Sequence, residues 1–357
     1  MRAIENEHES FNRYPGGLGH KRLRELMAQR EAEREGVEVD PDLIALTNGS
    51  MQSVTMVGQA LMQERGDVVI TEKFTYSGTI SAYKGIGLDM VGIEMDEDGM
   101  RMDHLEDTLK RLDAEGRRPR FIYTLTNYQN PTGSVMPLDR KQELLALARR
   151  FDLPICEDNC YGDVHFEGDL VPSLFALDDG PDQIYIGSLS KILAPGIRLG
   201  YLHAREPRFS EILKHRHDAG SNTFAAAVAA EFYRDGIGAH CDVANPVLKD
   251  KRDLLLAALE AELGDQCVWS KPVGGLFLWI RLPDDIDMAK LVKVAFERGF
   301  YFATGQGFNV TGDVVPYIRL AFGHVPDDLI EAGIPVLASA VREARTSNAP
   351  RTFERLF

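Results

Sequence analysis

The chain of 357 residues is long enough for one large domain and a smaller one, and its composition, 44% hydrophobic and 27% charged, is ordinary for a globular protein. A formal net charge of −15 disfavours nucleic acid as a partner, because proteins that bind a polyanion usually carry a basic surface. The sequence has neither an apolar run long enough to span a membrane nor a signal-peptide core, so we expect no membrane partner and a cytoplasmic location. The four scattered cysteines predict buried thiols rather than disulfides or a metal site.

Short β-rich runs alternate with amphipathic segments between about residues 43 and 200, a pattern typical of a mainly parallel sheet flanked by helices. Helices are predicted over Asp103–Leu112, where leucines share one face, and over Pro137–Phe151, which opens with a proline. The predicted strands are Val68–Thr71, Val91–Met95, Arg120–Leu125, Leu153–Glu157, Gln183–Ile186 and Leu199–His203.

The pattern changes after about residue 240. A long charged helix is predicted over Val247–Leu263, followed by a strand over Gly274–Leu282 and a later strand over Tyr317–Phe322. These elements predict a second, smaller α+β domain. We therefore expect a large domain over residues 41–240 and a small C-terminal domain over residues 241–357, preceded by an N-terminal segment over residues 1–40.

The start of one predicted helix could bind an anion. Gly49, Ser50, Met51 and Gln52 open an amphipathic segment whose first turn has free backbone N–H groups, and Ser50 is the expected cap. Such a first turn is a natural seat for phosphate. Many helices begin in this way without binding anything, so the motif is weak when it stands alone.

Two polar residues follow the predicted strand that ends near Glu157. Asp158 is expected at the ligand-binding edge of the sheet, where a carboxylate can hold a proton on a heterocyclic nitrogen. Tyr161 lies three residues further on and could reach a hydroxyl group of the same ring. The alternative is that Asp158 caps the turn after the strand.

Lys191 lies just after another predicted strand, so we expect it at the same edge of the sheet. A partly desolvated lysine has a lowered pKa and can attack a carbonyl carbon to form a Schiff base. A single lysine is more often a surface residue whose stem packs on its loop. The neighbouring hydroxyls of Ser188 and Ser190 and the guanidinium of Arg198 suit a phosphate, which favours the catalytic interpretation.

Three further side chains have a functional and a structural interpretation each. Tyr76 could stack on a planar ring or be a core tyrosine. Asn130 lies in a predicted turn and could bind a ring oxygen or a substrate carboxylate, or the turn could be a plain loop. Arg319 lies in the middle of a predicted strand, on the opposite face of that strand from Ile318 and Leu320. It needs an acidic partner, which could be a substrate carboxylate or an Asp or Glu of the chain.

Taken together and in this order, these segments resemble the class I/II aminotransferases of pyridoxal-phosphate fold type I. The sequence pattern of the loop around Lys191 (residues 188–198) and of residues 272–279 resembles the branch that contains α-aminoadipate, kynurenine and aromatic aminotransferases. The resemblance extends from about Tyr14 to Phe322. It implies an α/β fold in which helices sandwich a mainly parallel seven-stranded sheet, with a smaller α+β domain beside it.

The resemblance also implies a pyridoxal 5′-phosphate (PLP) cofactor and a role for each candidate residue. Lys191 would hold PLP as a Schiff base and later move the substrate proton, while Asp158 would keep the pyridine nitrogen protonated. Tyr161 and Asn130 would bind the ring oxygen. The remaining implied roles are Tyr76 for ring stacking, Ser50, Met51, Gln52, Ser188, Ser190 and Arg198 for the phosphate, Tyr14 for the phosphate of the neighbouring subunit, and Arg319 with Asn130 for the substrate carboxylate.

The implied activity is transfer of the amino group of an α-amino acid to a 2-oxo acid by a homodimer with shared active sites. Residues 1–40 would pack with the small domain and the dimer interface. The same scaffold could instead serve a β-lyase, a synthase or an oxidase. A ligand sensor is disfavoured, because the few residues before Tyr14 cannot hold a helix-turn-helix. The chain departs from the branch at Met51 and Phe74, where glutamine and proline are usual, and in its short N-terminal arm, which leaves the substrate class open.

Overall fold

The structure is a computed structural model that describes residues 2–7, 9–346 and 355–357. Within them, the large domain is built on a seven-stranded sheet of order β1-β9-β8-β7-β6-β2-β3. Strand β9 runs antiparallel to both of its neighbours, and the other strands run parallel to one another. The predicted mainly parallel sheet is therefore confirmed. Its strands are β1 (Ile44–Thr47), β2 (Val68–Glu72), β3 (Asp89–Ile93), β6 (Phe121–Thr124), β7 (Ile155–Asp158), β8 (Gln183–Ser188) and β9 (Gly200–Ala204).

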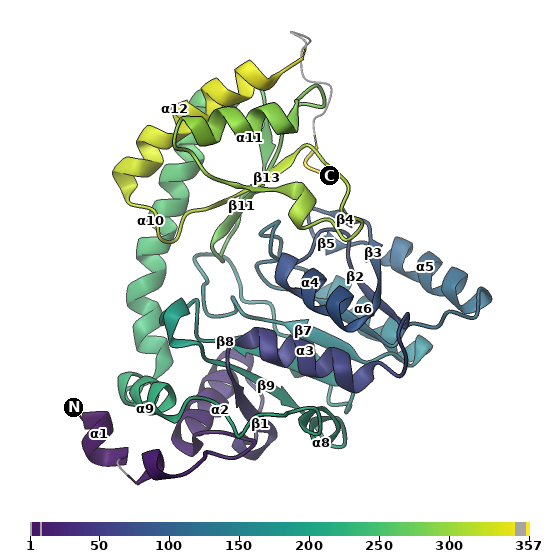
Figure 1. Cartoon of the computed structure of the whole chain (residues 1–357), viewed down its shortest axis with the longest axis vertical. Helices are drawn as coiled ribbons and strands as arrows, with labels where there is room; N and C mark the ends of the chain where they lie inside the picture. The colour runs from purple at the N-terminus through teal and green to yellow at the C-terminus, as the bar shows by residue number, and fades with distance from the viewer. Residues whose placement is uncertain (1, 8, 347–354) are drawn as a thin grey trace.

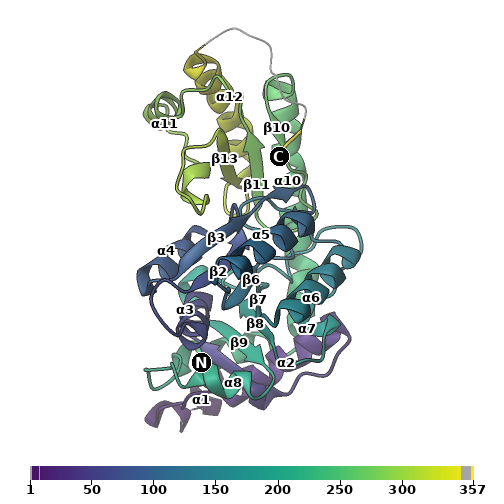
Figure 2. The same ribbon diagram turned by 90° about the vertical axis from the view of Figure 1, so that its right-hand side faces the viewer.

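Helices cover both faces of this sheet (Figure 2). Helices α3 and α4 pack on one face through Val54, Val57 and Tyr83, and α5 and α6 pack on the other through Leu109 and Leu144. Each helix turns a stripe of apolar residues to the strands, as the periodicity predicts. The helices of this domain are α1 (Arg2–Glu7), α2 (Lys21–Glu35), α3 (Ser50–Leu61), α4 (Ser77–Ile86), α5 (Met102–Ala114), α6 (Leu138–Phe151), α7 (Leu174–Leu177), α8 (Arg208–Leu213) and α9 (Thr223–Phe232).

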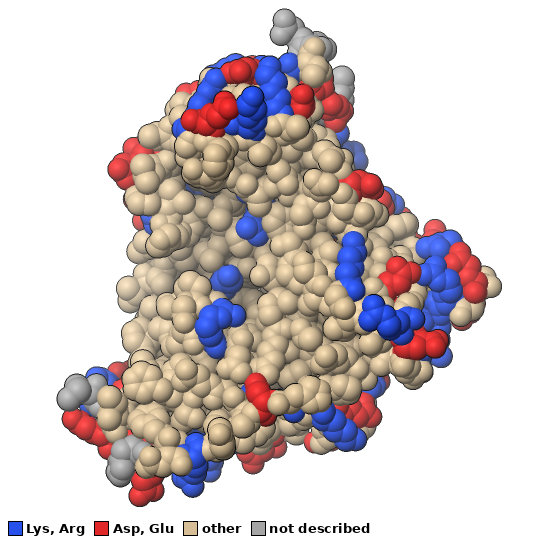
Figure 3. Space-filling model, in the orientation of Figure 1, with Lys and Arg blue, Asp and Glu red and all other residues tan. Residues whose placement is uncertain are grey.

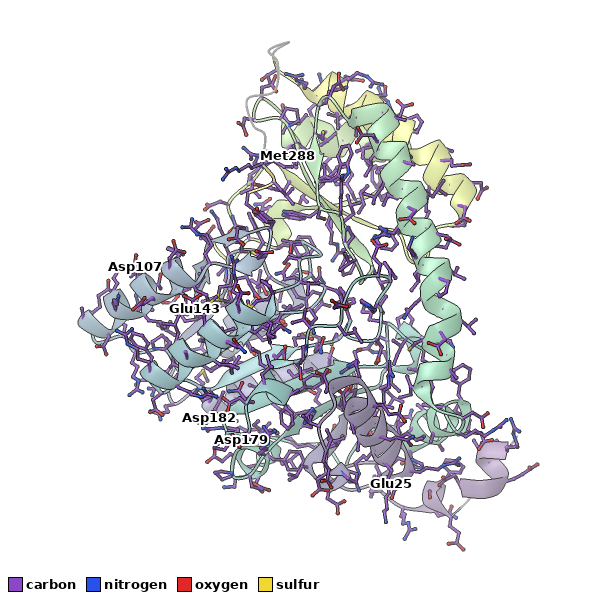
Figure 4. The ribbon with its side chains drawn as sticks, turned by 180° about the vertical axis from the view of Figure 1, so that it is seen from behind. Glu25, Asp107, Glu143, Asp179, Asp182 and Met288 are labelled. Atoms are coloured by element: carbon purple, nitrogen blue, oxygen red, sulfur yellow. The ribbon has the colours of Figure 1, made fainter. Side chains whose placement is uncertain are left out.

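The face that Figure 4 shows from behind is formed by α5 and α6 together with α2. Asp107 on α5 and Glu143 on α6 are exposed, while the leucines of the same two helices pack against the sheet. A short hairpin of β4 (Met95–Asp96) and β5 (Gly99–Met100) precedes α5. This side of the domain is therefore a solvated outer layer, and the loops that leave the carboxyl ends of the strands lie at another edge.

The predicted small α+β domain is also present. Its sheet has the order β10-β11-β13-β12 with antiparallel pairs, and its core joins residues of this sheet to residues of three helices. Helix α10 runs from the large domain into the small one (Figure 1). The elements are α10 (Ile237–Leu263), β10 (Val268–Trp269), β11 (Phe277–Arg281), α11 (Met288–Glu297), β12 (Ala303–Thr304), β13 (Tyr317–Ala321) and α12 (Asp327–Ala344).

Several element boundaries differ from the prediction. Helix α10 begins at Ile237 rather than Val247 and continues through Pro246, so the two domains share a helix. Strand β11 begins only at Phe277, because Gly275 has a φ of 73°, which lies outside the β region. Strand β1 was not predicted at all.

Helix α2 packs chiefly on the large domain, and not on the small domain as expected for residues 1–40. Leu23 and Met27 join a core that contains Ile44 and Leu46 of β1. Further along the same face of α2, Arg30 and Arg34 contact Asp163, which follows β7, at 2.8 and 3.1 Å. This buried ion pairing fixes the loop after β7. A role of residues 1–40 at a dimer interface stays a prediction.

None of the helices in the described part of the chain is both long and apolar enough to cross a membrane.

Candidate active site

The candidate residues meet in one cavity beside the carboxyl ends of β6, β7 and β8. Because these parallel strands are neighbours in the sheet, Asn130, Asp158 and Lys191 converge although they are far apart in the sequence. Figure 3 shows a hollow in the middle of this face, with isolated basic groups and with acidic groups toward the periphery. The lining residues are Ser50, Met51, Tyr76, Leu125, Asn130, Asp158, Cys160, Tyr161, Ser188, Ser190, Lys191 and Arg198, of which only Leu125 and Cys160 were not predicted.

Lys191 lies on the turn that directly follows β8, and its side chain is half-buried. The Nζ atom is 5.5 Å from the centroid of the Tyr161 ring. Burial lowers the pKa of Lys191, and the nearby cations of Arg319 and Arg198 lower it further, against the opposite effect of Asp158. A larger fraction of this amine is therefore neutral at a given pH than for an exposed lysine, and the neutral amine is the nucleophile.

The first turn of α3 and Arg198 together form a candidate anion-binding site. Gly49 is the N-cap of α3 with a φ of 81°, so the expectation that Ser50 caps the helix is wrong. Glycine is needed at position 49 because a Cβ atom there would overlap the Arg198 guanidinium. Ser50 is the first residue of the helix. On the other side, the Ser188 hydroxyl accepts a hydrogen bond of 3.2 Å from the Ser190 backbone N–H. Free N–H groups, hydroxyls and a guanidinium at a helix start favour a phosphate.

Asp158 is the last residue of β7 and is buried. Its Oδ2 atom accepts a hydrogen bond of 2.6 Å from the Tyr123 hydroxyl, and its Oδ1 atom accepts one of 3.3 Å from the Cys160 backbone N–H. Burial raises the pKa of Asp158, whereas these donors and the Lys191 cation act in the opposite direction. A protonated ring nitrogen placed in this cavity would give the buried carboxylate a cationic partner.

Arg319 reaches the edge of the cavity from β13 of the small domain. Its Nη1 atom donates a hydrogen bond of 2.8 Å to Asn130 Oδ1, and the Asn130 amide lies 3.5 Å from the Tyr161 hydroxyl. The guanidinium lies over the rings of Phe277 and Phe308, at 3.9 and 4.7 Å from their centroids. Burial lowers the pKa of Arg319.

No acidic side chain pairs with Arg319 among the residues that the structure describes, and its buried Nε atom has no hydrogen-bond partner there. The structural interpretation of Arg319, an ion pair with an Asp or Glu of the chain, therefore loses its support. A planar guanidinium with unused donors can bind a carboxylate in two-pronged geometry. The cavity thus brings together an amine, a buried carboxylate and the first turn of α3, and at its edge lies an arginine whose Nε donor is unused.

A family model described as aminotransferase class I and II matches residues 1–335. The chain belongs to this family. It is 35% identical over 329 residues to aromatic-amino-acid aminotransferase 1 of Thermococcus litoralis, an alignment that covers 91% of this chain and 78% of that protein. It is 29% identical to the 2-aminoadipate transaminase of Thermus thermophilus, over 96% of this chain and 84% of that protein.

Among solved structures, the kynurenine aminotransferase of Pyrococcus horikoshii in complex with PMP matches this aminotransferase with a TM-score of 0.89 and 32% identity, over 96% of this chain and 86% of that chain. The predicted family, its branch and its fold are confirmed.

Two predicted cofactor residues of this aminotransferase lie outside the cavity. Gln52 turns to the side of α3, where its amide nitrogen donates to Asp218 at 2.6 Å and its amide oxygen accepts from the Asn48 backbone at 2.8 Å. Tyr14 is 83% exposed and lines a separate surface depression. The expected contact of Gln52 with a cofactor therefore has no support within this chain, while that of Tyr14 depends on a second subunit.

Proposed function

We propose that this aminotransferase uses PLP at Lys191 to transfer the amino group of an α-amino acid to a 2-oxo acid. The single observation that carries the proposal is the convergence of Lys191, Asp158 and Arg319 on one cavity. Lys191 is suited to bind an aldehyde carbon, Asp158 a ring nitrogen and Arg319 a carboxylate. The family membership supports the same reaction.

The residues of the cavity fit PLP on grounds of chemistry. When bound, PLP supplies an aldehyde carbon and a pyridine ring that accepts electrons. The first turn of α3, the Ser188 and Ser190 hydroxyls and Arg198 would hold its phosphate, Tyr76 would stack on the ring, and Asp158 would bind the ring nitrogen. The Asp158 carboxylate is buried and forms no ion pair with a residue that the structure describes, which supports this placement.

The other side chains would orient the substrate and move its proton. Arg319 and Asn130 would bind the substrate carboxylate and fix the direction of the Cα–H bond. Phe277 and Phe308 would exclude water from that pair, which strengthens it. The Lys191 amine, once released, would accept the proton from the substrate Cα and return it to a neighbouring carbon, because its lowered pKa leaves it neutral more often.

The decisive experiment is a panel of amino donors tested against 2-oxoglutarate and pyruvate, read by the bleaching of the cofactor absorption and by the 2-oxo acid formed. Transamination predicts that product formation beyond one equivalent per subunit occurs only when an acceptor is supplied. Release of ammonia with a 2-oxo acid in the absence of an acceptor would instead indicate a β-lyase, and consumption of oxygen would indicate an oxidase.

Arg319→Met is expected to lower kcat/KM for α-amino acids by on the order of 100-fold or more, because a desolvated carboxylate would lose its charged partner. Met keeps the apolar stem between the two phenyl rings. A primary amine without a carboxylate serves as the internal control, and its rate should be nearly unchanged. An equal loss for both substrates would show that the substitution damages the site rather than carboxylate binding.

Gly49→Ala is expected to weaken PLP binding by about 10-fold or more, because the methyl group strains a φ of 81° and displaces the Arg198 guanidinium. Gly36→Ala is the matched control, since Gly36 has a φ of 72° but open space around the position of a Cβ atom. Both variants should lose similar thermal stability. PLP titration of the two apo-proteins should separate them, and equal PLP affinities would contradict the proposed phosphate seat.

We also infer a homodimer in which Tyr14 of one subunit contacts the phosphate of the other. The apolar side chains of Phe224, Val228 and Phe232 on α9, each between 39 and 53% exposed, support a covered face next to the exposed Tyr14. Light scattering gives the mass in solution, and Phe224→Glu should shift it toward the monomer while weakening PLP binding. A cytoplasmic location stays a prediction.

A further inference from the structure

A row of hydrogen bonds leads away from the cavity behind Asp158. The Thr79 hydroxyl donates to the Tyr123 hydroxyl at 2.9 Å, and the Tyr123 hydroxyl donates to Asp158 Oδ2 at 2.6 Å. Thr79 and Tyr123 are fully buried, and Asp158 is 3% exposed. Neither Thr79 nor Tyr123 lines the cavity, so their hydroxyls can act on a cofactor only through Asp158.

The direction of these bonds is fixed by chemistry. An ionised carboxylate only accepts, so Tyr123 must donate its hydrogen to Asp158. The oxygen of Tyr123 is then free to accept from Thr79, and a hydroxyl that accepts one bond donates a stronger one. The other Asp158 oxygen, Oδ1, accepts the longer bond of 3.3 Å from the Cys160 backbone N–H, and the Cys160 thiol is a further donor to the carboxylate. The hydrogen bond from Tyr123, at 2.6 Å, is thus shorter than the backbone hydrogen bond from Cys160.

The scaffold holds Tyr123 in place for this role. Tyr123 lies on β6, next to β7, which ends at Asp158, and its ring meets that of Tyr83 edge to face at 5.6 Å. Thr79 lies in the first turn of α4, three residues after Tyr76 at the helix N-cap. One short segment therefore carries both the tyrosine proposed to stack on the ring and the donor that orients Tyr123.

We propose that Tyr123, oriented by Thr79, is a positioning residue that keeps the Asp158 carboxylate ionised and turned toward the nitrogen of the cofactor. The inference rests on the proposed function, because it needs PLP in the cavity. Its physical cause is that a buried carboxylate tends to take up a proton unless donors stabilise its charge. The pKa of Asp158 is raised by burial, and the hydrogen bonds from Cys160 and Tyr123 oppose that rise.

Loss of the Tyr123 hydroxyl therefore has a specific consequence. Asp158 would take a proton more readily, and a neutral Asp158 no longer favours a protonated ring nitrogen. The ring would then accept electrons less well, so kcat should fall, whereas KM for the amino acid should change little because Arg319 and Asn130 are untouched. A purely structural role of Tyr123 would lower stability without changing the protonation of the ring nitrogen.

The test compares Tyr123→Phe with Tyr83→Phe. Tyr83 is an equally buried tyrosine of the same aromatic cluster, and its hydroxyl lies beside the Cys156 thiol. Two readouts are independent of turnover: the affinity of the apo-protein for PLP, and the NMR shift of PLP carrying ¹⁵N in its ring. Tyr123→Phe should weaken PLP binding about 10- to 100-fold, as for a lost bond to a charged group, and move the ¹⁵N shift toward that of the unprotonated ring. Tyr83→Phe should leave both unchanged.

Thr79→Val provides a second variant of nearly the same shape. It should weaken PLP binding by roughly 2- to 10-fold and shift the ¹⁵N signal in the same direction, because only a neutral hydrogen bond is lost. This variant also tests the inference if Tyr123→Phe fails to fold. A protonated ring nitrogen and unchanged PLP affinity in both variants would overturn the inference while leaving the proposed function intact. Failure of the unmodified protein to bind PLP would instead overturn the proposed function.

Discussion

Lys191→Ala is expected to abolish transamination, with kcat reduced by more than about 10³-fold. The substitution removes both the nucleophilic amine and the group that moves the substrate proton, and proton transfer by a positioned side chain alone contributes about 10² to 10⁴ in rate. The lysine side chain is half-buried at the cavity, on the turn after β8, and a truncation to Ala leaves the neighbouring buried residues in place, so its loss should change the unfolding temperature little. Product formation under saturating PLP measures the effect, and the cofactor absorption reports loss of the covalent link.

Lys191→Arg separates chemistry from charge. Arginine keeps the positive charge next to Tyr161 but does not lose its proton at any pH at which the protein is folded. It should therefore be as inactive as Lys191→Ala while binding PLP. Lys290→Ala, at an exposed position of α11, is the control that should keep full activity. Sustained transamination by Lys191→Ala would contradict the assignment of Lys191.

The position of the site could be predicted because the sequence marks the ends of the central strands. Apolar runs identify the strands that became β7 and β8, and polar residues follow each of them. Since parallel neighbours end at the same edge, Asp158 and Lys191 had to be close. The same reasoning covers Asn130, which follows β6. The predicted roles of these residues came from the family resemblance rather than from the strands.

Features that depend on contacts between distant segments could not be predicted. Strand β1 is as long as the predicted β6 and β7, but it pairs with β9, which lies far along the chain, so the strand depends on a contact between distant segments. The bond between Arg319 and Asn130 joins residues 189 positions apart. Gln52 faces away from the cavity because Asp218, from a separate loop, binds its amide.

The residues that support Asp158 were missed for a different reason. Tyr123 sits in a strand where every residue is buried, so alternation of polar and apolar residues gives no sign of which face is functional. Cys160, between two predicted site residues, was interpreted as a buried thiol, and it is indeed buried and free. Only the packed structure places it against the cavity as well. Proximity to Asp158 in the sequence was the one signal available for Cys160.

Asp158→Asn is expected to lower kcat by about 10² to 10³-fold, the range seen when one preorganised electrostatic partner of a reacting group is removed. Asparagine has nearly the same shape, and its amide oxygen can still accept the bond from Tyr123. It cannot carry the negative charge that favours a proton on the ring nitrogen, so the ring becomes a weaker electron acceptor. Stopped-flow absorption of the half-reaction with an amino acid measures the change directly.

Glu157→Gln is the matched control because Glu157 is the adjacent buried carboxylate of β7. It faces away from the cavity, accepts a bond of 2.8 Å from the Leu174 backbone and lies 3.9 Å from Lys141. Its loss leaves the buried Lys141 less well paired, which should lower the unfolding temperature while kcat stays within a few-fold. If both substitutions reduced kcat equally, the effect would come from the strand and not from the charge of Asp158.

For Asp158→Asn, we expect the stability of the apo-protein to stay equal or to rise although kcat falls. Burial raises the pKa of Asp158 in the folded state above its unfolded value of about 4. The unfolded state therefore loses this proton first, and the apo-protein loses stability as the pH rises from that value through the raised pKa. Asparagine has no such cost, so at neutral pH apo Asp158→Asn should unfold at a temperature equal to or above that of the unmodified protein. Gained stability with lost activity would identify Asp158 as a charge kept buried for its cofactor.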